Sequence, residues 1–214
     1  MATYPVQFDI PHNGLKWLEY YSSHNVYHPG WDLNKGVGNQ DLGNPVLAPV
    51  KGEVEYASPE PKLTNNYNGG FGWFVILYHP GYGVWTRYAH LNKILVRQNQ
   101  KVEEGDKIGE VGATGTAYAH LHWEGWKSTM YDIQRKYWRR FAYYPSGQTK
   151  AYITQHYFDP LQWVEELNKK PDWRQKEEEW VAQFVQDIPG LLSDFDSHRW
   201  IALIHRAVDN KKDK

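Results

Sequence analysis

The chain has 214 residues, which is enough for one domain of ordinary size with a buried core and a smaller appendage. Lys and Arg number 24 against 25 Asp and Glu, so the basic field typical of nucleic-acid-binding proteins is absent and no nucleic acid is expected as a partner. Cysteine is also absent, which excludes disulfides, thiolate metal sites and a cysteine nucleophile, and leaves histidine and carboxylate as metal ligands.

The first residues do not read as a secretory leader. Residues 1–7 contain neither a basic stretch nor an apolar core of signal-peptide length. No run of about 18 apolar residues occurs in the sequence, so no membrane span is expected. We expect that a leader has been removed or that the protein reaches its place of action by a route that needs none, such as release from a lysed cell.

Short apolar runs separated by Gly, Pro and Asn fill residues 43–111. Three of these runs, at 45–50, 74–78 and 83–88, are rich in β-branched and aromatic residues. Runs of this length with turns between them predict a system of antiparallel strands.

The pattern changes after residue 170. Pro171 suits the first turn of a helix, and apolar residues recur at roughly helical spacing between 173 and 188. Pro189-Gly190 ends this helix, and a second one is predicted around residues 196–208. About 45 residues are too few for a robust core of their own, so residues 171–214 are expected to form a helical appendage.

Three segments, at 27–33, 88–91 and 119–124, place histidines where they could meet. Residues two apart in a strand project from the same face, so His120 and His122 share a face with their Cα atoms about 6.5–7 Å apart. One imidazole could then bind a metal while the other faces the bound water, and the spacing leaves open which does which. The turn tendency of Pro29-Gly30 could bring His28 and Asp32 together. Two imidazoles and one carboxylate leave the fourth position of a tetrahedral zinc open, as in catalytic sites.

The chain resembles the lysostaphin/LytM-type zinc metallopeptidases over roughly 130 residues. The matching motifs, in chain order, are His28-x-Gly30-x-Asp32-Leu33, Pro45-Val46-x-Ala48-x-x-x-Gly52, Tyr88-Ala89-His90-Leu91, Val102-x-x-Gly105-x-x-Ile108-Gly109-x-Val111-Gly112-x-x-Gly115, His120-Leu121-His122-Trp123-Glu124 and Asp159-Pro160.

Three features depart from the family pattern. The segment 34–43 is longer than the usual link and introduces Asp41, which we interpret as a turn residue rather than a rival ligand. Trp123 stands where the family more often has Phe. Residues 125–157 form a long insertion, rich in aromatic residues and Arg, that either walls the cleft or packs on the C-terminal helices.

The resemblance implies the following roles. One zinc ion per chain would be held by His28, Asp32 and His122. His120 would be the general base, and His90 would orient water or stabilise the oxyanion. The substrate would be the peptide part of peptidoglycan, at stem cross-links or interpeptide bridges, so the protein would act at the bacterial cell wall.

The surrounding residues carry further predictions. We expect the aromatic side chains Trp31, Tyr88 and Trp123 to contact the substrate. Glu124 is expected to point away from the face of His122. His79 lies at a strand end and is interpreted as structural.

The expected fold is mainly β: an open, partly barrel-like antiparallel sheet of the duplicated hybrid motif type, with C-terminal α-helices. The metallopeptidase domain would comprise residues 1–170, with its core at 27–124. Two other readings remain: a non-hydrolytic wall-binding or amidase-activator module of the same fold, and a biotin- or lipoyl-carrier-like barrel. A carrier needs a lysine presented on a tight hairpin, and no such turn is present. The oligomeric state cannot be predicted.

Overall fold

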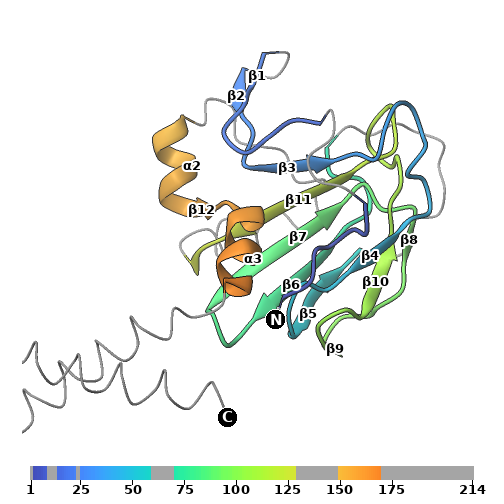
Figure 1. Cartoon of the computed structure of the whole chain (residues 1–214), viewed down its shortest axis with the longest axis vertical. Coiled ribbons are helices and arrows are strands. Elements are labelled where there is room, and N and C mark those ends of the chain that lie inside the picture. The colour runs from blue at the N-terminus through green and yellow to red at the C-terminus, as the bar shows by residue number, and fades with distance from the viewer. Residues whose placement is uncertain (1, 9–13, 23–24, 59–69, 129–148, 170–214) are drawn as a thin grey trace, which may run out of the picture. The chain divides into compact units, whose positions relative to one another are not determined.

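A computed structural model describes residues 2–8, 14–22, 25–58, 70–128 and 149–169 (Figure 1). All of these residues except Lys169 belong to one compact unit, Met1–Asn168. The helices predicted at 171–214 lie outside the described residues.

A seven-stranded antiparallel sheet forms the centre of this unit, with the order β12-β11-β7-β6-β5-β9 and with β3 also paired to β11. β3 and β12 occupy successive parts of one edge of β11, and β7 lies along its other edge. The strands of this sheet are β3 (Gly30–Leu33), β5 (Gly52–Ala57), β6 (Val75–His79), β7 (Val84–Ala89), β9 (Lys101–Val102), β11 (Leu121–Trp126) and β12 (Tyr157–Phe158).

Two smaller sheets complete the β structure of the described residues. One has three strands in the order β4-β10-β8, and the other pairs β1 with β2. Their bounds are β1 (Tyr20–Tyr21), β2 (Val26–Tyr27), β4 (Pro45–Leu47), β8 (Lys93–Ile94) and β10 (Lys107–Glu110). The mainly β, antiparallel and open fold is therefore confirmed, and the apolar runs of the sequence are β4, β6 and β7.

Two helices flank β12 in the chain, and both lie beside it in Figure 1. α2 (Lys150–His156) begins after Thr149, whose hydroxyl accepts the amide of Tyr152. α3 (Pro160–Asn168) begins after Asp159, whose carboxylate accepts the amides of the second and third helical residues. Such caps satisfy amides that have no partner within the helix. Neither helix was predicted from the sequence.

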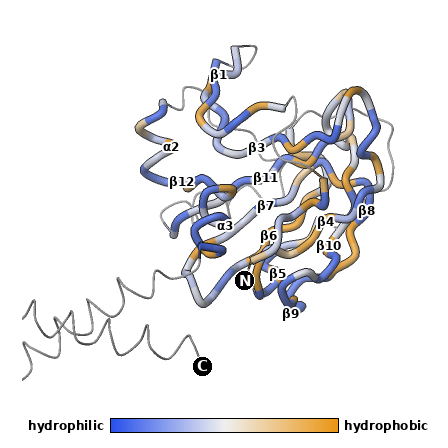
Figure 2. Tube along the Cα trace, in the orientation of Figure 1, coloured by the Kyte–Doolittle hydropathy of each residue, from blue (hydrophilic) through white to orange (hydrophobic). Residues whose placement is uncertain are grey.

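The strands of the main sheet carry apolar side chains on both faces, and the faces belong to different clusters. In β6, Val75 and Leu77 pack into one cluster while Ile76 packs into the other. In β7, Tyr88 and Ala89 divide in the same way. Hydrophobic stretches accordingly recur along β4, β5, β6 and β10 in Figure 2. A strand covered on both faces can hold polar side chains away from water only if they have partners.

His79 is a buried histidine away from the predicted metal site. Its Nε2 lies 2.8 Å from the Thr86 hydroxyl, and its Nδ1 lies 3.1 Å from the Lys51 carbonyl oxygen. Burial lowers the pKa of His79 from 6.5 to about 4, while the Lys51 carbonyl acts in the opposite direction. The structural interpretation of His79 agrees with this setting.

The buried His79 should make folding sensitive to acid. As pH falls below 6.5 the unfolded chain binds a proton at His79, whereas the folded chain stays neutral there down to about pH 4. Stability is therefore lost through this window, by about 2–4 kcal/mol. Urea unfolding of the metal-free protein, measured from pH 7 to pH 4 in chelator, should show a smaller loss for His79→Gln. Equal losses for both proteins would contradict this account.

Candidate metal and catalytic site

Pairing between β3 and β11 brings the predicted metal ligands together. Asp32 lies directly opposite His122, and Gly30 lies directly opposite Glu124. A Cβ atom on Gly30 would lie 2.5 Å from the Trp123 carbonyl oxygen and 2.9 Å from the Glu124 Cβ. Only glycine permits so close an approach, so Gly30 allows β3 to lie against β11. The expected turn at Pro29-Gly30 is only a bend at Pro29, because Gly30 already belongs to β3.

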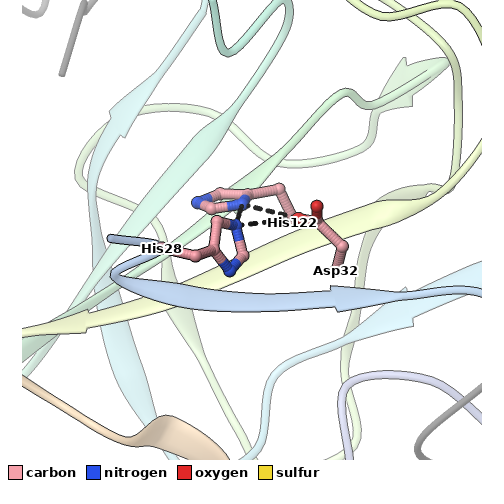
Figure 3. A group of neighbouring side chains, drawn as sticks. All are labelled: His28, Asp32 and His122. Carbon is pink, nitrogen blue, oxygen red and sulfur yellow. Dashed lines mark hydrogen bonds and ion pairs between the residues drawn. The ribbon is translucent and has the colours of Figure 1, made fainter. Parts of the chain in front are cut away.

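Three donor atoms converge at this pairing, as Figure 3 shows. Asp32 Oδ1 lies 2.9 Å from His122 Nδ1 and 3.2 Å from His28 Nε2. The two imidazole nitrogens lie 3.1 Å apart. The edges of a tetrahedron with metal–ligand bonds of about 2.0–2.1 Å measure about 3.3–3.4 Å, close to this triangle. These residues could therefore hold a small divalent metal ion.

The electrostatics of the three donors also suit a cation. Burial acts to raise the pKa of Asp32, but the charges of His28 and His120 and hydrogen bonds from His122 and His28 hold it well below 3.8. Burial acts to lower the pKa of His122, but Asp32 and Glu124 outweigh it and raise the pKa to about 9. The two carboxylates thus attract positive charge to His122, which a metal ion would supply in place of the proton.

His120 lies beside this triangle, with its Nε2 3.7 Å from Asp32 Oδ1. Its Nδ1 is 3.0 Å from the Tyr118 carbonyl oxygen. Because a carbonyl oxygen only accepts, Nδ1 carries the proton of the neutral ring and Nε2 keeps its lone pair. The His120 side chain is 14% exposed, whereas that of His122 is 3% exposed, so His120 is the more accessible of the two histidines to solvent.

His90 lies against His120, with the two ring centroids 4.6 Å apart. Its Nδ1 donates to the Thr114 carbonyl oxygen at 2.8 Å, which again leaves Nε2 as an acceptor. Burial and the neighbouring His120 and His122 lower the pKa of His90 to about 3, so the ring is neutral at ordinary pH. Its backbone φ of 61° is in the left-handed region, a strained state that is common at functional sites.

Gly112 allows the His90 and His120 segments to approach each other. It forms an isolated bridge with His120, and a Cβ there would lie 2.6 Å from the His90 carbonyl oxygen and 2.2 Å from the Asn92 nitrogen. The five residues predicted to bind metal or act in catalysis therefore form one cluster, although only three of them are close enough to share a metal.

The aromatic residues that were predicted to contact the substrate are buried or partly buried in the fold. Tyr88 and Trp123 are completely buried, so neither can touch a substrate, and the prediction is corrected to a core-packing role. Both pack into the hydrophobic cluster on the face of the sheet opposite the site. Trp31 is half-buried, and its indole nitrogen donates to Asp159 Oδ1 at 2.8 Å. Asp159 thereby ties β3 to the start of α3.

The prediction that Glu124 points away from the face of His122 is wrong. Glu124 faces the same side of β11 as His122, because residues two apart share a face, and His122 Nε2 lies 3.0 Å from Glu124 Oε2. The two-residue alternation of side chains along a strand would have predicted that Glu124 shares a face with His122. Arg87, which the sequence analysis did not single out, lies opposite Glu124 on β7 with its Nη1 3.2 Å from Oε1.

Asp41 occupies the turn expected for it. Its carbonyl oxygen accepts the backbone amide of Asn44 at 3.0 Å and the Asn44 side-chain amide at 2.9 Å. The side chain is buried, and burial raises the pKa of its carboxyl group. Asp41 is not among the residues whose donor atoms converge on the triangle.

The model of peptidase family M23 matches residues 26–133, just over half of the chain. Murein hydrolase activator NlpD of Escherichia coli K12 is 35% identical over 92 residues, covering 42% of this chain and 22% of that protein. Peptidoglycan DD-endopeptidase ShyA of Vibrio cholerae is 38% identical over 84 residues, covering 39% of this chain and 17% of that protein. Among solved structures, a zinc containing peptidase from Vibrio cholerae is 28% identical with a TM-score of 0.45, covering 58% of this chain and 36% of that one.

The matched region spans less than a quarter of the length of the two sequence relatives. Of the helices in the described part of the chain, none is long and apolar enough to cross a membrane.

Proposed function

Because the chain belongs to peptidase family M23, we propose that it is a zinc metalloendopeptidase that hydrolyses peptide bonds of bacterial peptidoglycan, at stem cross-links or interpeptide bridges. The observation that carries this proposal is the triangle of donor atoms from His28, Asp32 and His122, with His120 and His90 beside it. The protein would therefore act at the cell wall, as the names of two relatives suggest for those proteins.

His28 Nε2, Asp32 Oδ1 and His122 Nδ1 would hold one zinc ion. The chemistry that zinc supplies when bound is a lowered pKa for a water molecule and polarisation of the scissile carbonyl group.

His120 would act as the general base through Nε2. Tyr118 holds the proton on Nδ1, so the other nitrogen is ready to accept a proton from the attacking water. His90 presents the same tautomer and is held neutral. An acceptor nitrogen can orient a water hydrogen but cannot donate to an oxyanion, so of its two predicted roles we favour the orientation of water.

An activator without hydrolytic activity is the second candidate. The similarity to murein hydrolase activator NlpD favours it, since the same fold region would then serve to bind another enzyme or the wall. Hydrolysis is favoured by the chemistry of the site, because this chain carries both the three donors and two histidines whose Nδ1 atoms donate to backbone carbonyl oxygens.

Digestion of purified sacculi separates the two candidates. The zinc-loaded protein alone, incubated with sacculi of several wall chemistries, should release peptide fragments whose masses identify the bond cut. Heat-inactivated protein and a chelator-treated sample serve as controls. If no fragments appear from any wall while zinc remains bound, hydrolysis is excluded and the activator reading replaces it.

A further inference from the structure

Glu124 divides its two oxygen atoms between two neighbours on its own strand. Oε2 accepts from His122 Nε2 at 3.0 Å, and Oε1 accepts the indole N–H of Trp126 at 2.7 Å. Glu124 and Trp126 are completely buried, and His122 is 2% exposed. Both donors therefore depend on Glu124 in a place where water cannot substitute for it.

Arg87 forms a fully buried ion pair with this carboxyl group, with its Nη1 3.2 Å from Oε1. The guanidinium group itself is held by aromatic rings, with its Cζ 3.9 Å from the Phe71 centroid and 4.4 Å from the Trp126 centroid. Contacts of this kind favour a cation in an apolar setting. Arg87 thus helps to fix the position of Glu124.

The contact with Glu124 has a consequence for the two nitrogens of His122. A carboxylate can only accept, so Nε2 must carry a proton that it donates to Glu124. Nδ1 faces the Asp32 carboxylate at 2.9 Å and lies in the donor triangle, so it is the nitrogen at which a metal ion would take the place of a proton and find a lone pair. Histidines that bind metals commonly donate their other N–H to a carboxylate, which sets both the tautomer and the ring orientation.

We propose that Glu124, held by Arg87, is a positioning residue for metal binding that fixes His122 with its proton on Nε2 and its lone pair on Nδ1. The inference rests on the proposed metal site. The proposal adds to that site a buried series of interacting side chains, Arg87, Glu124 and His122, that connects β7 with β11.

Glu124→Gln tests the proposal with little change of shape. An amide has one carbonyl oxygen, so it cannot accept from both His122 and Trp126, and one of the two donors would face an NH₂ group. We expect the dissociation constant for zinc, measured by competition with a chelator of known affinity, to rise about 10–100-fold. In the zinc-loaded wild type, the ¹⁵N spectrum of the imidazoles should show a slowly exchanging Nε2–H for His122, and this signal should shift or exchange faster in the variant.

Two further variants separate positioning from general loss of stability. Leu77→Ala opens the cluster on the opposite face of the sheet and should lower the unfolding midpoint while leaving zinc affinity within about threefold of wild type. If Glu124→Gln does not fold because Arg87 is left without its carboxylate, Arg87→Met/Glu124→Gln removes both charges. That pair should fold and still bind zinc 10–100-fold more weakly.

The outcomes are distinct. Wild-type zinc affinity in a folded Glu124→Gln or double variant would overturn the positioning role and leave the proposed function intact. An equal loss of affinity in Leu77→Ala would overturn it too, because the effect would then belong to the whole fold. Failure of the wild-type protein itself to bind zinc would instead overturn the proposed function.

Discussion

Replacing His120 with alanine is expected to leave zinc bound while lowering turnover about 10²–10⁴-fold, the range for loss of a general base. His120 Nε2 lies 3.7 Å from Asp32 Oδ1, outside the 2.9–3.2 Å triangle of the three donors. Its Nδ1 proton is held by Tyr118, so Nε2 has its lone pair available to accept a proton. The measurement is release of peptide from sacculi, with zinc content determined on the same sample.

His122→Ala is the matched comparison, because it removes an imidazole two residues further along the chain, at the second residue of β11. This variant should lose both zinc and activity, since its Nδ1 belongs to the triangle. His156→Ala, at the end of α2, controls for loss of an imidazole outside the cluster and should retain both. If His120→Ala loses the metal and His122→Ala retains it, the two roles are reversed.

The second large effect is expected from Asp32→Ala, which should lose most of its zinc and with it the activity. Asp32 supplies the only negative charge of the triangle, and its Oδ1 is shared between both imidazoles at 2.9 and 3.2 Å. Without that carboxylate two neutral rings would have to hold a dication, with one protein ligand fewer than catalytic zinc sites use. Elemental analysis of the purified variant measures the remaining metal.

Glu103→Ala is a suitable control for this experiment, because it removes an exposed carboxylate in a turn between β9 and β10. Its zinc content should equal that of the wild type. Full retention of zinc in Asp32→Ala would show that Asp32 is not a ligand, and would contradict the assignment of the three-donor triangle as the metal site.

Local patterns were enough to predict several strands and the histidines that meet at the candidate site. The short apolar runs identified β4, β6 and β7, because alternation and β-branched residues report on a pleated, half-buried surface. The same rule placed His120 and His122 on one face of a strand. By the same rule Glu124 shares that face with His122, so the prediction that it points away was wrong.

Burial on both faces of the sheet was harder to predict. Tyr88 and Trp123 looked available to a substrate because aromatic residues suit both a groove and a core. A strand that is packed on both sides has no exposed face. The sequence of the strand does not show which segments pack against each side. The helices α2 and α3 were missed for a related reason: each is short, and its start depends on a side-chain cap rather than on a long apolar stripe.

The sequence by itself determined the antiparallel β fold and the short motifs that contain His28, Asp32, His90, His120 and His122. Only the tertiary structure decided which of these atoms meet. The register of β3 on β11 joins residues about ninety positions apart, and it puts His122 rather than His120 against Asp32. The physical reason is that a two-residue period specifies which face a side chain occupies, whereas the neighbouring strand and its register are set by pairing and packing over the whole sheet.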